Sequence, residues 1–409
     1  MLTNVIVWYK NLYPVTQFFA VRGASLGEVL LRIEQTRWTE VKGWEPAPPG
    51  ELGEAVQLVL LFGSTSLLTG KQHLAEIKKA YPKAHLLGCS TSGEICGIQV
   101  FDDSLVVTAI SFEHTVVKGR VLKIHDVGCS FTTGELLAQS LDKEELVHVF
   151  ALSDGLTVNG SELVAGLTKH LPANVTVTGG LSGDGARFRE TFVIWDGEPE
   201  QNVIVALGLY GSRLKVGYGS LGGWDAFGPE RLITRSKGNV LYELDGHSAL
   251  QLYKKYLGEH ANGLPAAGLL FPLSIRAQQR ETPVVRTILS VGEDDQSMTF
   301  AGDVPEGAYA RFMKVNSDRL IDGAIGAAKT SYQAGGAVSP DLAVLVSCVG
   351  RKLVLKQRAE EEVEGVREIL GAGTVLTGFY SYGEIAPFAP GARSDLHNQT
   401  MTITTFSER

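Results

Sequence analysis

Short apolar runs recur along the chain, and each is followed by a small polar residue and an amphipathic stretch. The runs cover residues 57–63 (QLVLLFG), 147–152 (VHVFAL) and 342–346 (LAVLV). Runs of this length, rich in strand-forming residues, predict buried β-strands. The stretches that follow carry apolar residues at helical spacing and predict helices at 68–80, 161–170 and 353–370.

A second short strand is expected after each helix, and a glycine-rich turn comes next. The turns read GCSTSGEI from Gly88, GGLSGDG from Gly179 and GFYSYGEI from Gly378. A strand–helix–strand unit of this kind needs parallel strands joined by a crossover, which is almost always right-handed. The pattern therefore predicts an α/β (α+β mixed) fold, with two domains of mixed β-sheets flanked by helices, built partly from a repeated βαβ-type unit.

The domain limits follow from breaks in this pattern. Residues 1–50 are expected to be an entry segment that packs on the first domain, with a helix from a capping box at Ser25 to about Gln35. The first domain is expected over 51–245 and the second over 246–409. Between the second and third repeats lie further predicted strands and the helices 248–257 and 317–332.

The composition is typical of a globular protein and disfavours partners such as nucleic acid or a membrane. Of the 409 residues, 44% are hydrophobic and 20% charged, which is ordinary for a globular protein with a large core. The net charge of −8 disfavours nucleic acid and anionic membrane surfaces as partners. No segment reaches the roughly 18 apolar residues that a membrane span needs. Four cysteines without a CxxC pair are expected to be free thiols, so we expect a cytoplasmic protein.

Polar residues at the carboxyl ends of the predicted parallel strands are the first candidate ligand contacts, because open α/β sheets bind ligands there. After the first strand of a repeat these are Ser64, Ser153 and Asp154, and in the first glycine-rich turn they are Ser92 and Glu94. Hydroxyls and amides at these places suit a small anion. The alternative is structural, since Ser and Asp are also preferred helix caps.

A second group of candidates surrounds the last glycine-rich turn. Arg286 interrupts the apolar run PVVRTILSV, so it either pairs with a buried acid or binds a ligand anion. The other members of the expected pocket are Tyr380, Ser381, Tyr382, Glu384 and Asn398. A purely structural role for the glutamate, satisfying the amides of its own turn, is the alternative.

Catalytic motifs are absent from the sequence. Residues 217–222 match GxGxxG, but no helical pattern follows, so a dinucleotide site is not expected. The nine histidines form no i,i+4 pair, and we expect no metal site. An enzyme with Cys89 or Ser90 as nucleophile is the catalytic alternative, although no base can be assigned to it. We expect a non-catalytic binding protein.

Several motifs together resemble the FIST family. GCSTSGEI belongs to the stretch that is similar to the N-terminal FIST domain, and YELDG, VPEG, GFYSYGEI and HNQTM to the stretch that is similar to the C-terminal one. The resemblance covers about residues 50–405. It implies an intracellular sensory module in signal transduction that binds a small ligand, proposed to be an amino acid or a similar small anionic metabolite.

The resemblance also implies how such a protein acts. Some family members are fused to output domains, whereas here residues 406–409 follow the last predicted strand directly. We therefore expect a separate signalling partner, such as a histidine kinase. No cofactor is expected. The alternative is a haem-based nitric-oxide sensor, for which His397 is the candidate axial ligand. The oligomeric state stays open.

Overall fold

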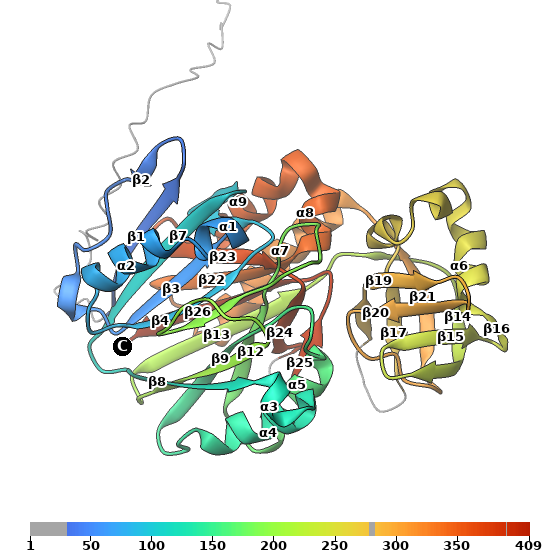
Figure 1. Cartoon of the computed structure of the whole chain (residues 1–409), viewed down its shortest axis with the longest axis horizontal. Helices are drawn as coiled ribbons and strands as arrows, with labels where there is room; N and C mark the ends of the chain where they lie inside the picture. The colour runs from blue at the N-terminus through green and yellow to red at the C-terminus, as the bar shows by residue number, and fades with distance from the viewer. Residues whose placement is uncertain (1–30, 278–282, 390) are drawn as a thin grey trace, which may run out of the picture.

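The computed structural model describes residues 31–277, 283–389 and 391–409. Two bodies are visible in Figure 1. The large body contains three six-stranded sheets and comprises residues 31–224 and 315–409, and the small body contains an eight-stranded sheet and comprises residues 225–314. Mixed sheets flanked by helices confirm the predicted fold class.

Each sheet of the large body takes strands from distant parts of the chain. Sheet 1 has the order β11 (Val193–Trp195), β4 (His85–Ser90), β3 (Leu58–Gly63), β7 (Ser104–Phe112), β1 (Leu31–Thr39) and β2 (Gly43–Glu45). Sheet 2 has the order β25 (Ser394–His397), β24 (Gly383–Pro387), β10 (Thr176–Leu181), β9 (Leu146–Ser153), β12 (Val203–Tyr210) and β8 (Val116–Lys123). Sheet 3 has the order β13 (Leu214–Leu221), β26 (Met401–Glu408), β22 (Leu342–Cys348), β23 (Val375–Ser381), β5 (Glu94–Cys96) and β6 (Gln99–Phe101).

The predicted repeat is confirmed, because each sheet of the large body contains one parallel pair of neighbouring strands. The pairs are β3 with β4, β9 with β10, and β22 with β23. The second strand of each pair carries a glycine at the equivalent position. Gly88 lies opposite Leu61, Gly179 opposite Ala151 and Gly378 opposite Leu345. These glycines are required by close packing. A Cβ on Gly378, for example, would lie 1.9 Å from the carbonyl oxygen of Leu345.

The three repeats exchange short strands in a cycle. The strand β5, which follows repeat 1, pairs with β23 of repeat 3. The strand β11, which follows repeat 2, pairs with β4 of repeat 1, and β24, which follows repeat 3, pairs with β10 of repeat 2. Every sheet of the large body is therefore completed by a strand from another repeat.

The three sheets share one apolar core. Alternate residues of the central strands point inward from all three sheets, including Phe62 of β3, Phe150 of β9 and Phe379 of β23. The other faces pack against helices, since a buried strand needs both faces covered. Sheet 1 is covered by α2 (Lys71–Ala80), sheet 2 by α4 (Ser130–Ser140) and α5 (Gly160–Lys169), and sheet 3 by α7 (Ser317–Ala334) and α9 (Ala359–Leu370). Shorter helices are α1 (Thr65–Leu68), α3 (Ile124–Val127) and α8 (Val349–Leu355), with 3-10 turns η1 (Gly53–Ala55) and η4 (Lys356–Arg358).

The small body has its own core, centred on Ile233, Tyr253 and Phe312. Its strands are β18 (Val284–Arg286), β17 (Leu273–Arg276), β21 (Tyr309–Lys314), β14 (Asp225–Lys237), β15 (Val240–Leu244), β20 (Ser297–Phe300) and β19 (Ile288–Gly292), with β16 (His247–Ser248) paired to β15. Its helices are α6 (Ala249–Leu257), η2 (Gly258–Gly263) and η3 (Ala266–Leu270). The expected domain limit at Asp245 lies in the turn between β15 and β16, and the division at this point stays a prediction.

Three local expectations need correction or comment. The helix expected to reach Gln35 is wrong over 31–35, because these residues form β1, which pairs along its whole length with β7; the start of that helix lies outside the described residues. The single helix expected at 353–370 is split at Lys356, which has a positive φ of 52°. Residues 217–221 lie in β13, an edge strand, and Gly222 follows it. Within the described ranges, no helix combines the length and apolar character needed to cross a membrane.

Candidate functional site at the junction of three turns

The glycine-rich turns of the three repeats meet at one place, the three-turn junction (residues 90–94, 181–185 and 380–384). Each turn follows the second strand of a parallel pair, so all three lie at carboxyl ends of strands. Backbone hydrogen bonds close the junction into a ring, from Ser92 N to Tyr380 O (2.8 Å), from Gly183 N to Ser90 O (2.9 Å) and from Tyr382 N to Leu181 O (3.2 Å). Donors and acceptors occupy equivalent positions in the three repeats, so the ring has approximate threefold symmetry.

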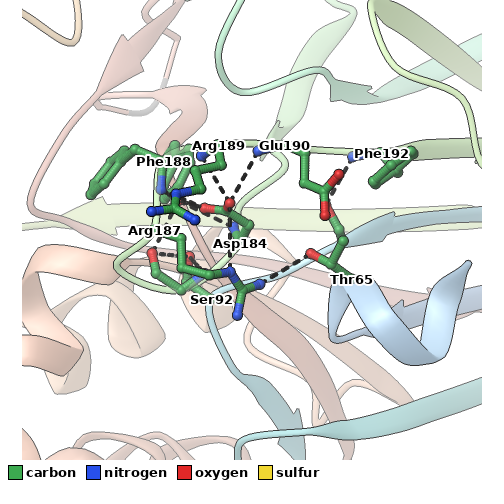
Figure 2. Close-up of polar contacts among 11 residues, drawn as sticks. Thr65, Ser92, Asp184, Arg187, Phe188, Arg189, Glu190 and Phe192 are labelled. Carbon is green, nitrogen blue, oxygen red and sulfur yellow. Dashed lines mark hydrogen bonds and ion pairs between the residues drawn. The ribbon is translucent and has the colours of Figure 1, made fainter.

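A buried carboxylate, Asp184, organises the loop that follows the second turn (Figure 2). It accepts hydrogen bonds from the backbone amides of Phe188 (2.8 Å), Arg189 (2.9 Å) and Glu190 (3.1 Å), and from the hydroxyl of Tyr382. Burial alone would raise the pKa of Asp184, but these hydrogen bonds lower it below its usual value. The carboxylate is therefore ionised and holds the loop in place.

The same loop covers the junction. The ring of Phe188 stacks on that of Tyr382, with centroids 4.4 Å apart, while Phe188 keeps 38% of its surface exposed. Arg187 donates to Thr65 Oγ1 at the start of α1 (3.3 Å) and lies 3.8 Å from Asp184, as Figure 2 shows. The Ser92 hydroxyl accepts from Gly185 N (3.1 Å). An aromatic ring and a guanidinium thus form the outer rim of the junction.

Two of the expected ligand contacts, Glu94 and Glu384, are fully buried and bind their own turns. Glu94 accepts from the hydroxyls of Thr91 and Ser104 and from Ser104 N. Glu384 accepts from the hydroxyl of Ser381 and from the amide and hydroxyl of Thr400. Each glutamate therefore fixes the first residues of the strand that returns to the sheet. Within its own turn each glutamate binds a hydroxyl, and the amide that it binds lies outside the turn.

Burial perturbs both glutamates in the same direction. It raises the pKa of Glu94 to about 7 and that of Glu384 to about 8, although the hydrogen bonds just described act to lower both. Lys352 also lowers the pKa of Glu94, and its Nζ donates to Ser92 O at 2.9 Å. Both carboxyls consequently change charge near neutral pH.

The second repeat uses Asp154 for the corresponding task. Its Oδ1 accepts from Leu156 N and Thr157 N, and its Oδ2 accepts from Thr191 Oγ1 and Asn202 N, with distances of 2.9–3.1 Å. The neighbouring Ser153 is buried, and its hydroxyl donates to a backbone carbonyl. Ser64 lies beside Ser66 at the N-cap of α1, 3.3 Å between hydroxyl oxygens.

Tyr380 belongs to a buried hydrogen-bond network whose other members were not predicted from the sequence. Its hydroxyl donates to Glu362 (2.7 Å), which also accepts from Ser347 and forms a fully buried ion pair with Arg351 (2.6 Å). Arg351 further donates to the carbonyl of Gly222 (2.6 Å), in the segment that leads into the small body. One signal was available, because Glu362 falls on the apolar face of the helical pattern.

Arg286 and Asn398 lie elsewhere, at the contact between the two bodies, which we call the seam. The seam comprises β18 and η3 of the small body, the N-terminus of α5 and residues 396–399. Arg286, 1% exposed, donates across it to Leu396 O (3.0 Å) and Ser161 Oγ (3.3 Å). Asn159 donates to Asp303 at 2.9 Å in the same region. The expected pocket is therefore distributed over the junction, the buried turns and the seam, and ligand contact by these residues stays a prediction.

Asn398 has an unusual environment. It is completely buried, and neither Nδ2 nor Oδ1 has a hydrogen-bond partner in the part of the chain that the structure describes. The same holds for Oε1 of Gln399. Buried polar groups are nearly always satisfied, so an unsatisfied one needs an explanation such as water or a ligand.

The residues of the alternative hypotheses have defined surroundings. Nε2 of His397 donates to Ala386 O (2.9 Å), so binding haem iron through this atom would require that bond to break. Burial raises the pKa of the Cys89 thiol well above its usual value, and the Ser90 hydroxyl accepts from Phe192 N (2.9 Å). Among the described residues, no group of three or more His, Cys, Asp or Glu side chains is arranged to hold a metal.

An uncharacterized protein, MJ1623, of Methanocaldococcus jannaschii is 27% identical over 231 residues, which are 51% of this chain and 44% of that protein. This chain thus aligns with less than half the length of that relative. A crystal structure of cyanuric acid hydrolase from A. caulinodans matches with 10% identity and a TM-score of 0.18, covering 72% of this chain and 99% of that one.

The family models give a clearer result. The FIST N domain matches residues 57–247, and the FIST C domain matches residues 249–387. The two models follow each other in the expected order and together cover most of the chain. The chain belongs to the FIST family.

Proposed function

We propose that this chain is a non-catalytic sensor of a small molecule that acts on a separate signalling protein, such as a histidine kinase, in the cytoplasm. FIST domains are associated with sensory signal transduction and small-ligand binding. The observation that carries the proposal is the seam, where a buried Asn398 lacks partners among the described residues and a buried Arg286 crosses between the two bodies.

A ligand bound at the seam can change how the two bodies are arranged, and this change can be recognised by a signalling partner. The two bodies are also connected by the chain, by a small apolar cluster around Trp224 and Met313, and by contacts of Asp225 with Asn316 and Arg319. A ligand that contacts both sides favours one arrangement over another, provided its affinity for the two differs. The partner would then recognise a surface whose shape depends on that arrangement.

The proposed ligand is an amino acid or a similar small metabolite with an anionic group. Arg286 supplies the guanidinium that binds a carboxylate, in exchange for its contacts to Leu396 O and Ser161. Glu384 pairs in register with His397, directly before Asn398, and its carboxyl group is proposed to accept a hydrogen bond from the amino group of the ligand. Tyr380, Ser381 and Tyr382 shape the neighbouring turn, and Ser64, Ser92, Glu94, Ser153 and Asp154 do so in the other repeats.

The proposal is tested by thermal unfolding of the full chain with amino acids and small carboxylates. A ligand that binds the folded state raises the unfolding temperature. Arg286→Ala is expected to abolish the shift, whereas Arg276→Ala, which removes an exposed arginine paired with Glu230, is expected to leave it unchanged. No shift with any compound would contradict the sensor role, and a shift that survives Arg286→Ala would contradict the site.

A further inference from the structure

We infer that the seam recognises its ligand through an amide: Asn398 pairs with a primary amide, urea or similar group that presents an N–H donor beside a carbonyl acceptor. The inference rests on the proposed function and names the chemical class that the same site selects. The proposed function names an amino acid or a similar anionic metabolite as the ligand. The inference adds which functional group of that ligand Asn398 recognises.

The side chain of Asn398 is the starting point. It is 0% exposed, and both its donor and its acceptor lack partners in the described parts of the chain. A neutral amide offers two N–H donors and a carbonyl oxygen, and burying such groups unpaired destabilises the fold. The neighbouring Gln399 adds a second unpaired acceptor, Oε1, while its Nε2 reaches only Leu269 O of the small body, at 3.4 Å.

The backbone that directly follows Asn398 is fixed by hydrogen bonds, which limits how its side chain can be placed. The carbonyl of Gln399 accepts from Trp224 Nε1 (3.0 Å), and Gln399 has a positive φ of 64°. Thr400 binds Glu384 through its amide and hydroxyl. A preorganised polar group loses little freedom when it binds, which favours specific recognition.

The donor and the acceptor of Asn398 can be paired at the same time only by certain functional groups of a ligand. A primary amide can donate to Asn398 Oδ1 and accept from Nδ2 at the same time. A carboxylate can accept from Nδ2, but it brings a second acceptor against Oδ1. An ammonium group can donate to Oδ1 and leaves Nδ2 unpaired. Sites with buried hydrogen-bonding groups reject ligands that leave those groups unpaired.

The position of Asn398 sets the order of events. Because Asn398 has no exposed surface, a ligand reaches it only when the segments that cover it move apart. The neighbours of Asn398 on both sides contact the small body, since Arg286 donates to Leu396 O and Gln399 donates to Leu269 O, so we infer that this movement opens the seam and that the seam closes over the bound ligand. Amide recognition thereby becomes linked to closure of the seam.

The test compares matched pairs of compounds by calorimetric titration of the full chain. L-glutamine and L-glutamate differ only in an amide and a carboxylate, as do L-asparagine and L-aspartate, and all four keep the carboxylate proposed to bind Arg286. The amide of each pair is expected to bind about tenfold or more tightly, since one compound pairs both atoms of Asn398 and the other does not. Asn398→Leu, which removes both the donor and the acceptor at a similar size, is expected to reduce this preference to about twofold or less.

Controls keep the outcome clear. Asn262→Leu changes an exposed asparagine of the small body and is expected to leave the amide preference intact. If Asn398→Leu fails to fold, the comparison of pairs in the unaltered protein decides alone. Equal binding of amide and carboxylate, or binding of the carboxylates only, overturns the amide inference and leaves the sensor proposal standing. A crystal structure with ordered waters on Asn398 that glutamine does not displace also overturns it.

Discussion

The hydroxyl of Tyr382 donates a hydrogen bond to the carboxylate of Asp184, and this bond joins the third repeat to the second. Tyr382 is also stacked on Phe188, whose amide binds the same carboxylate. One side chain therefore holds both the junction of the turns and the loop that covers it.

The first prediction concerns this bond. Tyr382→Phe removes the hydroxyl and keeps the ring, and it is expected to lower the free energy of unfolding by about 1.5–3 kcal/mol, the usual range for a hydrogen bond to a charged group. Urea unfolding measures the change. Phe188→Leu, which removes the stacked ring and keeps the hydrogen bond, serves as the comparison. No loss in Tyr382→Phe would contradict the role of the bond.

The same bond has a pH dependence. The pKa of Asp184 is lowered in the folded state, so its contribution to stability is present above the pKa of the unfolded chain and is lost as the pH falls through the folded value. The stability difference between the unaltered protein and Asp184→Asn should therefore shrink below about pH 4, near the ordinary aspartate value.

The second prediction concerns Glu384 and has the opposite sign. Its pKa is raised to about 8, so the folded protein keeps a proton that the unfolded chain releases. Stability should fall as the pH rises from about 4.3, the ordinary glutamate value, to about 8. Glu384→Gln has no proton to lose and is expected to reduce this slope. Thermal unfolding across this range measures it, with exposed Glu364→Gln as the unaffected control.

The third prediction concerns the buried ion pair of Arg351 and Glu362. Arg351→Met leaves a buried carboxylate without its counter-charge, which typically costs about 3–5 kcal/mol. The double variant Arg351→Met, Glu362→Met should recover part of this loss. Arg351 also binds Gly222 O, so hydrogen exchange around residue 223 should accelerate in both variants. Unchanged exchange there would contradict an anchoring role for Arg351.

The fourth prediction concerns Gly378. An added Cβ would lie 1.9 Å from Leu345 O, so Gly378→Ala must push two paired strands apart and is expected to lose about 2 kcal/mol or more. Gly373→Ala, with open space around the added Cβ, should change stability by less than about 0.5 kcal/mol. Equal effects of the two substitutions would show that the strand packing tolerates a methyl group at Gly378.

Local sequence patterns predicted the strand–helix–strand repeat. They did not predict which strands of different repeats pair with one another. Parallel pairing follows from a strand, a helix and a strand in succession, and the glycine-rich turns marked the strand ends. The partner of β5 is β23, however, and nothing near Glu94 in the sequence specifies a strand almost at the other end of the chain. For the same reason, residues 31–35 were assigned by their local capping pattern, whereas pairing with β7 decides their structure.

The candidate site, like the fold, could be predicted only in part from the sequence. The matching GEI turns pointed to Glu94 and Glu384 as equivalent, and they occupy equivalent places. The unpaired atoms of Asn398 could not be foreseen, because satisfaction of a side chain depends on every segment that surrounds it. Arg286 stood out as a charge in an apolar run, but its acceptor, Leu396 O, is a backbone atom that no motif identifies.

The cyclic exchange of strands has a consequence for how the protein folds. β5 is synthesised early, but its partner β23 begins at Val375, so sheet 3 stays incomplete until nearly the whole chain has left the ribosome. Pairings so distant along the chain slow folding, and an unpaired edge invites association with other chains. We therefore expect late, all-at-once folding, and aggregation of nascent chains stalled before residue 375.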